Sequence, residues 1–133
     1  MHPLLKISEA VSLALHTMSY LAALGTARAS THKIASDLGV SEAHLAKVMQ
    51  RLGRGGLVNS YRGPRGGFAL ARPPEKITLM DIYEAVEGPL AVRNCLLEQP
   101  VCSGRCILGD LLTRVSEQTR EYFANTTLAD LVH

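Results

Sequence analysis

Two amphipathic helical patterns, separated by a glycine, lie between residues 31 and 54. The first covers residues 31–38, with apolar residues at helical spacing, and Gly39 breaks it. Ser41 can cap the second pattern. Its apolar residues fall on one face: Leu45, Val48, Met49 and Leu52. Two helices joined by a short glycine-containing turn predict a helix-turn-helix, whose second helix enters the major groove of DNA.

The positive charge of the chain is concentrated in the same region. Residues 43–74 carry six Lys or Arg and no acidic residue, although the whole chain has 14 basic and 12 acidic residues. This concentration favours a surface that binds a polyanion, with nucleic acid as the leading partner, over an ordinary solvated face. The exposed face of the second helix supplies candidate DNA-binding residues: Lys47, Gln50, Arg51 and Arg54.

A glycine-rich hairpin is predicted directly after the second helix. Residues 57–61 and 68–71 have the pattern of short strands around a tip over residues 62–67, where glycines permit a tight turn. Arg62 and Arg65 would project from this wing toward phosphates or a narrow minor groove. The glycines do not match a nucleotide-binding P-loop, because no Lys-Ser/Thr pair follows them.

The rest of the chain is predicted to be helical. Apolar spacing indicates helices over residues 7–24, 77–86 and 107–125, and the broad apolar stripe of the last one suits a dimer interface. No apolar run is long enough to span a membrane. Polar residues at helical spacing argue against a signal peptide over residues 11–29, so we expect a cytoplasmic protein.

Three cysteines gather within 12 residues, with the spacing Cys95-x6-Cys102-x3-Cys106. Clustered cysteines in a reducing compartment indicate metal or redox chemistry, and thiolates suit an iron-sulfur cluster. Arg93 and Arg105 would favour the thiolate form. A zinc site, a cluster-free thiol switch and three incidental cysteines stay open as alternatives. No Cys/His/acid constellation suggests an enzyme.

The sequence over residues 56–73, GLVNSYRGPRGGFALARP, resembles the wing of the Rrf-two family of bacterial transcriptional regulators, of the IscR and NsrR type. The resemblance extends to residues 7–24, the helix-turn-helix, residues 77–82 and residues 127–132. It implies a mainly α fold with a small β-hairpin wing: a winged helix-turn-helix plus a long C-terminal dimerisation helix. A homodimer on palindromic double-stranded DNA is also implied, with Ser41, Ala43 and His44 opening the recognition helix and Arg62 as the wing arginine.

The same resemblance implies that the cysteines of each subunit hold one iron-sulfur cluster, but this chain departs from the family pattern. The family commonly separates successive cysteines by five residues. Some members have a histidine ligand where this chain has Gly109, which favours 4Fe-4S over 2Fe-2S. Others use an acidic residue of the first helix where this chain has Ser12. The fourth position is either open to a small molecule or filled by one of four residues: Glu9, Ser12, His16 and Asp110.

These observations predict three segments and one function. Residues 1–88 form the DNA-binding domain, residues 89–106 the cysteine-bearing cluster loop, and residues 107–133 the dimerisation helix and tail. The expected function is a DNA-binding regulator that senses redox state, nitric oxide or iron-sulfur status through the cluster. The alternative is a cluster-free repressor that uses the cysteines as a thiol switch, or that senses a metabolite or a partner.

Overall fold

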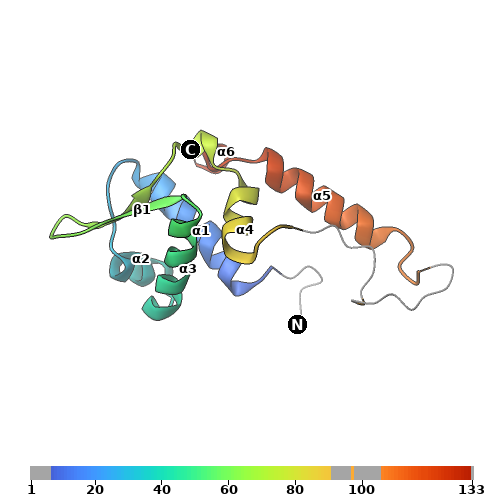
Figure 1. Ribbon diagram of the computed structural model, residues 1–133, viewed down its shortest axis with the longest axis horizontal. Coiled ribbons are helices and arrows are strands. Elements are labelled where there is room, and N and C mark those ends of the chain that lie inside the picture. Colours follow the sequence, from blue (N-terminus) through green and yellow to red (C-terminus); the bar gives the residue numbers. More distant parts are fainter. Residues whose placement is uncertain (1–6, 91–96, 98–105, 133) are drawn as a thin grey trace.

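The computed structural model describes residues 7–90, 97 and 106–132 (Figure 1). Within these residues the elements follow in this order: α1 (Glu9–Leu24), α2 (Thr31–Leu38), α3 (Glu42–Arg54), β1 (Val58–Tyr61), β2 (Gly67–Leu70), the 3₁₀ helix η1 (Pro74–Lys76), α4 (Leu79–Glu87), α5 (Leu111–Asn125) and α6 (Leu128–Leu131). The predicted mainly helical, winged fold is confirmed. The 3₁₀ helix η1 was not predicted.

Local capping defines the helix-turn-helix. The Ser30 hydroxyl accepts from the backbone N–H of Lys33 at 3.1 Å, and the Ser41 hydroxyl accepts from that of His44 at 3.2 Å. Between the two helices Gly39 adopts the left-handed conformation, with φ of 69°. The helix predicted over residues 31–38 is therefore observed with the same bounds, and α3 begins directly after its predicted cap.

The hydrophobic core lies where α1 packs against α3 and α4. Its fully buried large side chains come from α1, α2, α3, α4, α6 and the loops beside β1 and α4: Val11, Met18, Leu21, Ile34, Leu45, Val48, Met49, Leu52, Leu57, Ile77, Ile82 and Leu128. Because the buried residues of α3 occupy one face of the helix, the opposite face is directed to solvent.

The wing is anchored to the loop that precedes α2. β1 and β2 pair antiparallel, with Ser60 opposite Phe68. Phe68 also exchanges two backbone hydrogen bonds with Ala29, at 3.2 Å and 2.7 Å. Gly67 has a φ of +127°, and a Cβ there would lie 2.6 Å from the carbonyl carbon and oxygen of Ala29. Only glycine permits this close approach.

Gly67→Ala is therefore expected to destabilise the fold by about 1–3 kcal/mol, because it adds a backbone clash to an unfavourable φ. Urea unfolding followed by circular dichroism measures the change. The matched control is Gly53→Ala inside α3, where a Cβ meets nothing within 4 Å; it should be neutral or stabilising by up to about 1 kcal/mol. Equal stabilities for the two variants would contradict the close approach.

The C-terminal part of the chain differs from the sequence prediction. The last long helix was expected from residue 107 but begins at Leu111, because residues 107–110 form a turn in which Gly109 has a φ of +62°. α5 extends away from the body (Figure 1). After it, the chain returns: Leu79 N–H donates to the Thr126 carbonyl at 3.0 Å, and Leu128 N–H donates to the Ile77 carbonyl at 2.9 Å.

Two side chains fix this returning segment. Leu128 is fully buried in the core, and Phe123 at the end of α5 packs edge-on against Tyr83 of α4, with ring centroids 6.0 Å apart. Residues 126–131 therefore pack as part of the winged helix-turn-helix body. The sequence had grouped them with the dimerisation helix, since no local pattern reveals a contact with residues 77–79.

Candidate nucleic-acid interface

Four of the exposed residues on the solvent-facing side of α3 form a stripe along the helix, and Arg51 is exposed beside them. The four recur at positions i, i+4, i+7 and i+11 and so lie along one line of the helix: Ala43, Lys47, Gln50 and Arg54. Small Ala43 lies nearest the N-terminal end, where recognition helices contact base edges. The three longer side chains supply a cationic head, an amide and a guanidinium, which can bond to bases or phosphates. We call these four residues the recognition stripe.

His44 and Arg51 lie on a different flank of α3. They are seven residues apart, and both are displaced from the recognition stripe toward α1 and α4. His44 is half-buried, and Nη1 of Arg51 donates to the backbone carbonyl of Val86 in α4, at 3.1 Å. Helical spacing alone had placed these two residues on the same exposed face as the stripe. The position of α4 relative to α3, which separates them from it, is set by tertiary packing and has no local sequence signal.

The exposed wing arginines, Arg62 and Arg65, occupy the turn between β1 and β2. Gly66 beside them is also closely packed, because a Cβ there would lie 2.4 Å from the Tyr61 carbonyl oxygen. Arg28 was not predicted as a site residue; its guanidinium carbon lies 3.5 Å from the centroid of the Tyr61 ring. This cation–π contact adds a third arginine beside the wing. Its sequence signal was weak, because Arg28 precedes the acid-free region over residues 43–74.

Polar contacts on the surface hold α2 in place. The Tyr20 hydroxyl of α1 donates to Asp37 Oδ2 at 2.5 Å, and Lys33 Nζ lies 3.2 Å from the other oxygen of the same carboxylate. The hydrogen bond from Tyr20, and then that from Lys33, lowers the pKa of Asp37 below its usual range. His32 contacts Glu42 at the start of α3, at 3.2 Å. These contacts lie at the surface, so they orient α2 rather than provide much stability.

Of the three cysteines, the structure describes Cys106; Cys95 and Cys102 lie outside the described residues. Cys106 is half-buried just before α5, and the backbone N–H of Leu108 donates to its sulfur at 3.5 Å. Backbone donors of this kind tune the sulfur of a metal ligand. Within the described ranges, no three His, Cys, Asp or Glu side chains are placed to hold a metal ion.

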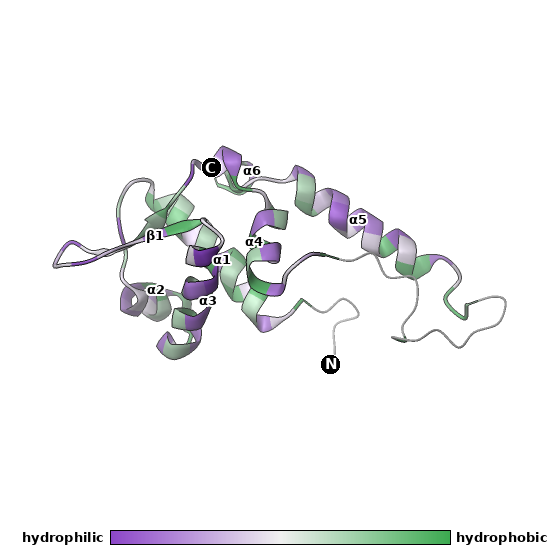
Figure 2. Ribbon diagram, in the orientation of Figure 1, coloured by the Kyte–Doolittle hydropathy of each residue, from purple (hydrophilic) through white to green (hydrophobic). Residues whose placement is uncertain are grey.

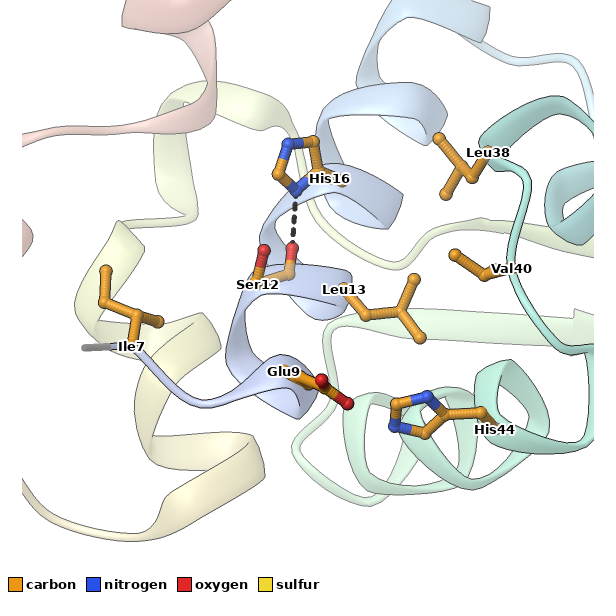
Figure 3. Close-up of a pocket in the computed structure, with 8 residues that line it drawn as sticks. All are labelled: Ile7, Glu9, Ser12, Leu13, His16, Leu38, Val40 and His44. Atoms are coloured by element: carbon orange, nitrogen blue, oxygen red, sulfur yellow. Dashed lines mark hydrogen bonds between the residues drawn. The ribbon is translucent and has the colours of Figure 1, made fainter. Parts of the chain in front are cut away.

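Three of the four candidate fourth ligands line one pocket (Figure 3). Its volume is about 470 Å³, and it lies between the first half of α1, the turn before α3 and His44. Glu9, Ser12 and His16 all belong to α1. Nδ1 of His16 donates to the Ser12 carbonyl at 2.7 Å, which leaves Nε2 free of that bond. The fourth candidate, Asp110, forms an ion pair with Arg114 at 3.1 Å instead.

α5 presents apolar side chains away from the core. Phe123 is buried within the chain's own body, but Leu111 is 42% exposed and Tyr122 is 57% exposed, and Leu112 and Val115 are half-buried. Figure 2 shows apolar residues at the start of α5 and hydrophilic ones through its middle. No helix in the described part of the chain combines the length and the hydropathy needed to cross a membrane.

A helix-turn-helix followed by an arginine-bearing hairpin defines the winged-helix class of DNA-binding proteins. The Rrf2 (Rrf-two) family model, described as an iron-dependent transcriptional regulator, matches residues 7–133. The chain therefore belongs to the Rrf2 family of transcriptional regulators, which confirms the resemblance seen in its sequence. Members of this family are regulators of transcription, so the chain is not an enzyme.

Individual relatives cover almost the whole chain. A protein of Aquifex aeolicus, whose name places it among helix-turn-helix transcriptional regulators, is 35% identical over 130 residues, which are 95% of this chain and 90% of that protein. The solved structure of CymR, the global cysteine regulator of B. subtilis, has a TM-score of 0.81 and 32% identity, and covers 96% of both chains. T. potens IscR has a TM-score of 0.74 and 30% identity over 96% of this chain and 85% of its own.

Proposed function

We propose that this transcriptional regulator is a cytoplasmic homodimer that binds a palindromic operator and senses redox state, nitric oxide or iron-sulfur status through a cysteine-held cluster. The observation that carries the DNA-binding part is the recognition stripe, exposed opposite the buried face of α3. The description of the matching family as iron-dependent supports the sensing part. The spacing of the three cysteines supports it as well.

Each part of the interface has its own role in this proposal. Lys47 and Gln50 read base edges in the major groove, with Ser41 and Ala43 at the close approach of the helix start. Arg54 contacts a phosphate. Arg62 and Arg65 contact phosphates or the minor groove beside it. A second subunit, joined through the apolar side chains of α5, would supply the other half-site.

The residues present fit an iron-sulfur cluster in their donor chemistry. Cys106 is half-buried, and its sulfur accepts a backbone N–H. Cys95, Cys102 and Cys106 of each subunit would hold the cluster, with 4Fe-4S favoured over 2Fe-2S because Gly109 replaces a histidine ligand. Such a cluster supplies a group whose oxidation state and ligands respond to oxygen, nitric oxide and iron. Cys106 lies just before α5, so its position affects the relation between that helix and the winged-helix body.

The similarity to CymR, named as a cysteine regulator, favours one alternative. In it, the three cysteines act as a cluster-free thiol switch on the same DNA-binding fold. The half-buried thiol of Cys106 is compatible with both proposals. They differ in whether iron is bound.

Replacing Cys95, Cys102 and Cys106 together by alanine is expected to leave the winged-helix fold intact and to abolish the response of DNA binding to nitric oxide and oxidants. The reason is that the cysteines lie outside the recognition stripe and the wing. Fluorescence anisotropy with a labelled operator, before and after anaerobic addition of a nitric oxide donor, measures this. Ser103→Ala, in the same segment, is the control and should keep the response. A response that persists in the triple variant would overturn both cysteine-based proposals.

A further inference from the structure

The C-terminal end of α4 is a junction to which two other helices are attached. Nη1 of Arg51 in α3 donates to the Val86 carbonyl at 3.1 Å. The hydroxyl of Ser8, which caps α1, donates to Oε1 of Glu87 at 2.7 Å and accepts from the Val11 N–H at 3.2 Å. The last turn of α4 therefore has polar contacts with both the recognition helix and the start of α1.

The electrostatics of a helix end explain why the Arg51 guanidinium bonds to the Val86 carbonyl. The last carbonyls of an α-helix have no partner within the helix, and they carry the negative end of its dipole. A guanidinium is a suitable partner because it is always charged and has several N–H donors. Arg51 thus satisfies the carbonyl of Val86 with a charged donor from another helix.

A second observation shows that α3 and α4 approach closely at this place. Gly55 follows the last residue of α3, and a Cβ at Gly55 would lie 2.9 Å from the Cβ of Ala85. Ala85 directly precedes Val86, so a close backbone approach and a charged hydrogen bond occur side by side. The C-terminal half of α3 is therefore held in one position relative to α4.

We propose that Arg51 is a positioning residue, which sets the recognition stripe relative to α4, and that it does not contact DNA. This inference rests on the proposed function in one respect, that α3 is the helix that reads DNA. Loss of the contact leaves α3 free to shift, so a smaller fraction of the protein holds the stripe in register with the bases. Operator binding then weakens, but no phosphate contact is lost.

The test compares Arg51→Met with Arg54→Met, the matched control from the recognition stripe. Both variants remove one positive charge from α3 and keep an unbranched apolar side chain. The dissociation constants are measured at several salt concentrations, on an operator duplex selected from a random pool and on a scrambled duplex. For Arg51→Met we expect about tenfold weaker operator binding, an unchanged affinity for scrambled DNA and an unchanged salt slope. For Arg54→Met we expect the slope to fall by about one on both duplexes.

A measurement on the unaltered protein covers the case in which Arg51→Met fails to fold. In ¹⁵N NMR spectra, the side-chain N–H signals of Arg51 should stay unshifted when operator DNA is added, whereas those of Arg54 should move. A lower salt slope for Arg51→Met, unchanged operator binding by that variant, or a DNA-dependent shift of the Arg51 signals would overturn the proposal. Failure of the unaltered protein to select or bind any duplex would instead refute the proposed function, and this inference with it.

Discussion

The double substitution Lys47→Ala and Gln50→Ala should abolish discrimination between the operator and other DNA. Both of these side chains read base edges in the proposed interface, and the loss of such a contact costs about 1–3 kcal/mol, or roughly 5- to 150-fold in affinity. The two residues lie on the exposed stripe of α3 and make no contribution to the buried face. Anisotropy titrations on the selected operator and on a scrambled duplex measure the ratio of the two affinities.

The substitution of both Arg62 and Arg65 by alanine provides the contrast. If these wing arginines contact phosphates, their loss weakens binding to both duplexes and lowers the salt slope by about two. Lys76→Ala controls for loss of charge, because Lys76 is exposed in η1, which packs against α6.

Unchanged discrimination by the Lys47/Gln50 double variant would show that α3 does not read the sequence of the DNA.

The second large effect concerns the stability of the folded chain. Leu128→Ala is expected to lower the free energy of unfolding by about 2–5 kcal/mol, because a fully buried leucine leaves a cavity in the core. Chemical denaturation gives the value. Leu131→Ala in the same helix, α6, is the control: Leu131 is 45% exposed, so its loss should cost much less.

This comparison tests whether residues 126–131 belong to the winged-helix body. If residues 126–131 belonged to an independent dimerisation segment, Leu128→Ala and Leu131→Ala would change the free energy of unfolding equally little. Equal stabilities for the Leu128 and Leu131 variants would therefore contradict the packing described above.

Local signals predicted the winged helix-turn-helix well, because its elements are bounded by residues with strong conformational preferences. Ser41 caps α3 as expected, and Gly39 ends α2 in a left-handed conformation. The glycines of the wing also predicted the hairpin. The limits of the prediction appear where tertiary packing decides, as with Leu128, which is buried and whose backbone N–H bonds to the carbonyl of the distant residue Ile77.

The candidate interface shows the same division. Helical spacing separated the buried from the exposed face of α3, but it could not separate Arg51 from Lys47 and Gln50, because the position of α4 decides where Arg51 is bonded. Arg28 was missed for a related reason: only the folded wing brings Tyr61 over its guanidinium. Cys95 and Cys102 lie outside the described residues, so their role stays a prediction from the cysteine spacing.

The most direct test of the sensing proposal is anaerobic purification of the full chain, followed by a visible absorption spectrum and iron and sulfide counts per subunit. The proposal predicts brown protein with equal amounts of iron and sulfide, about four of each per subunit for the favoured cluster. Colourless protein that binds no iron, even after reconstitution with iron and sulfide, would contradict the cluster. That result would leave the thiol switch on the same winged-helix fold.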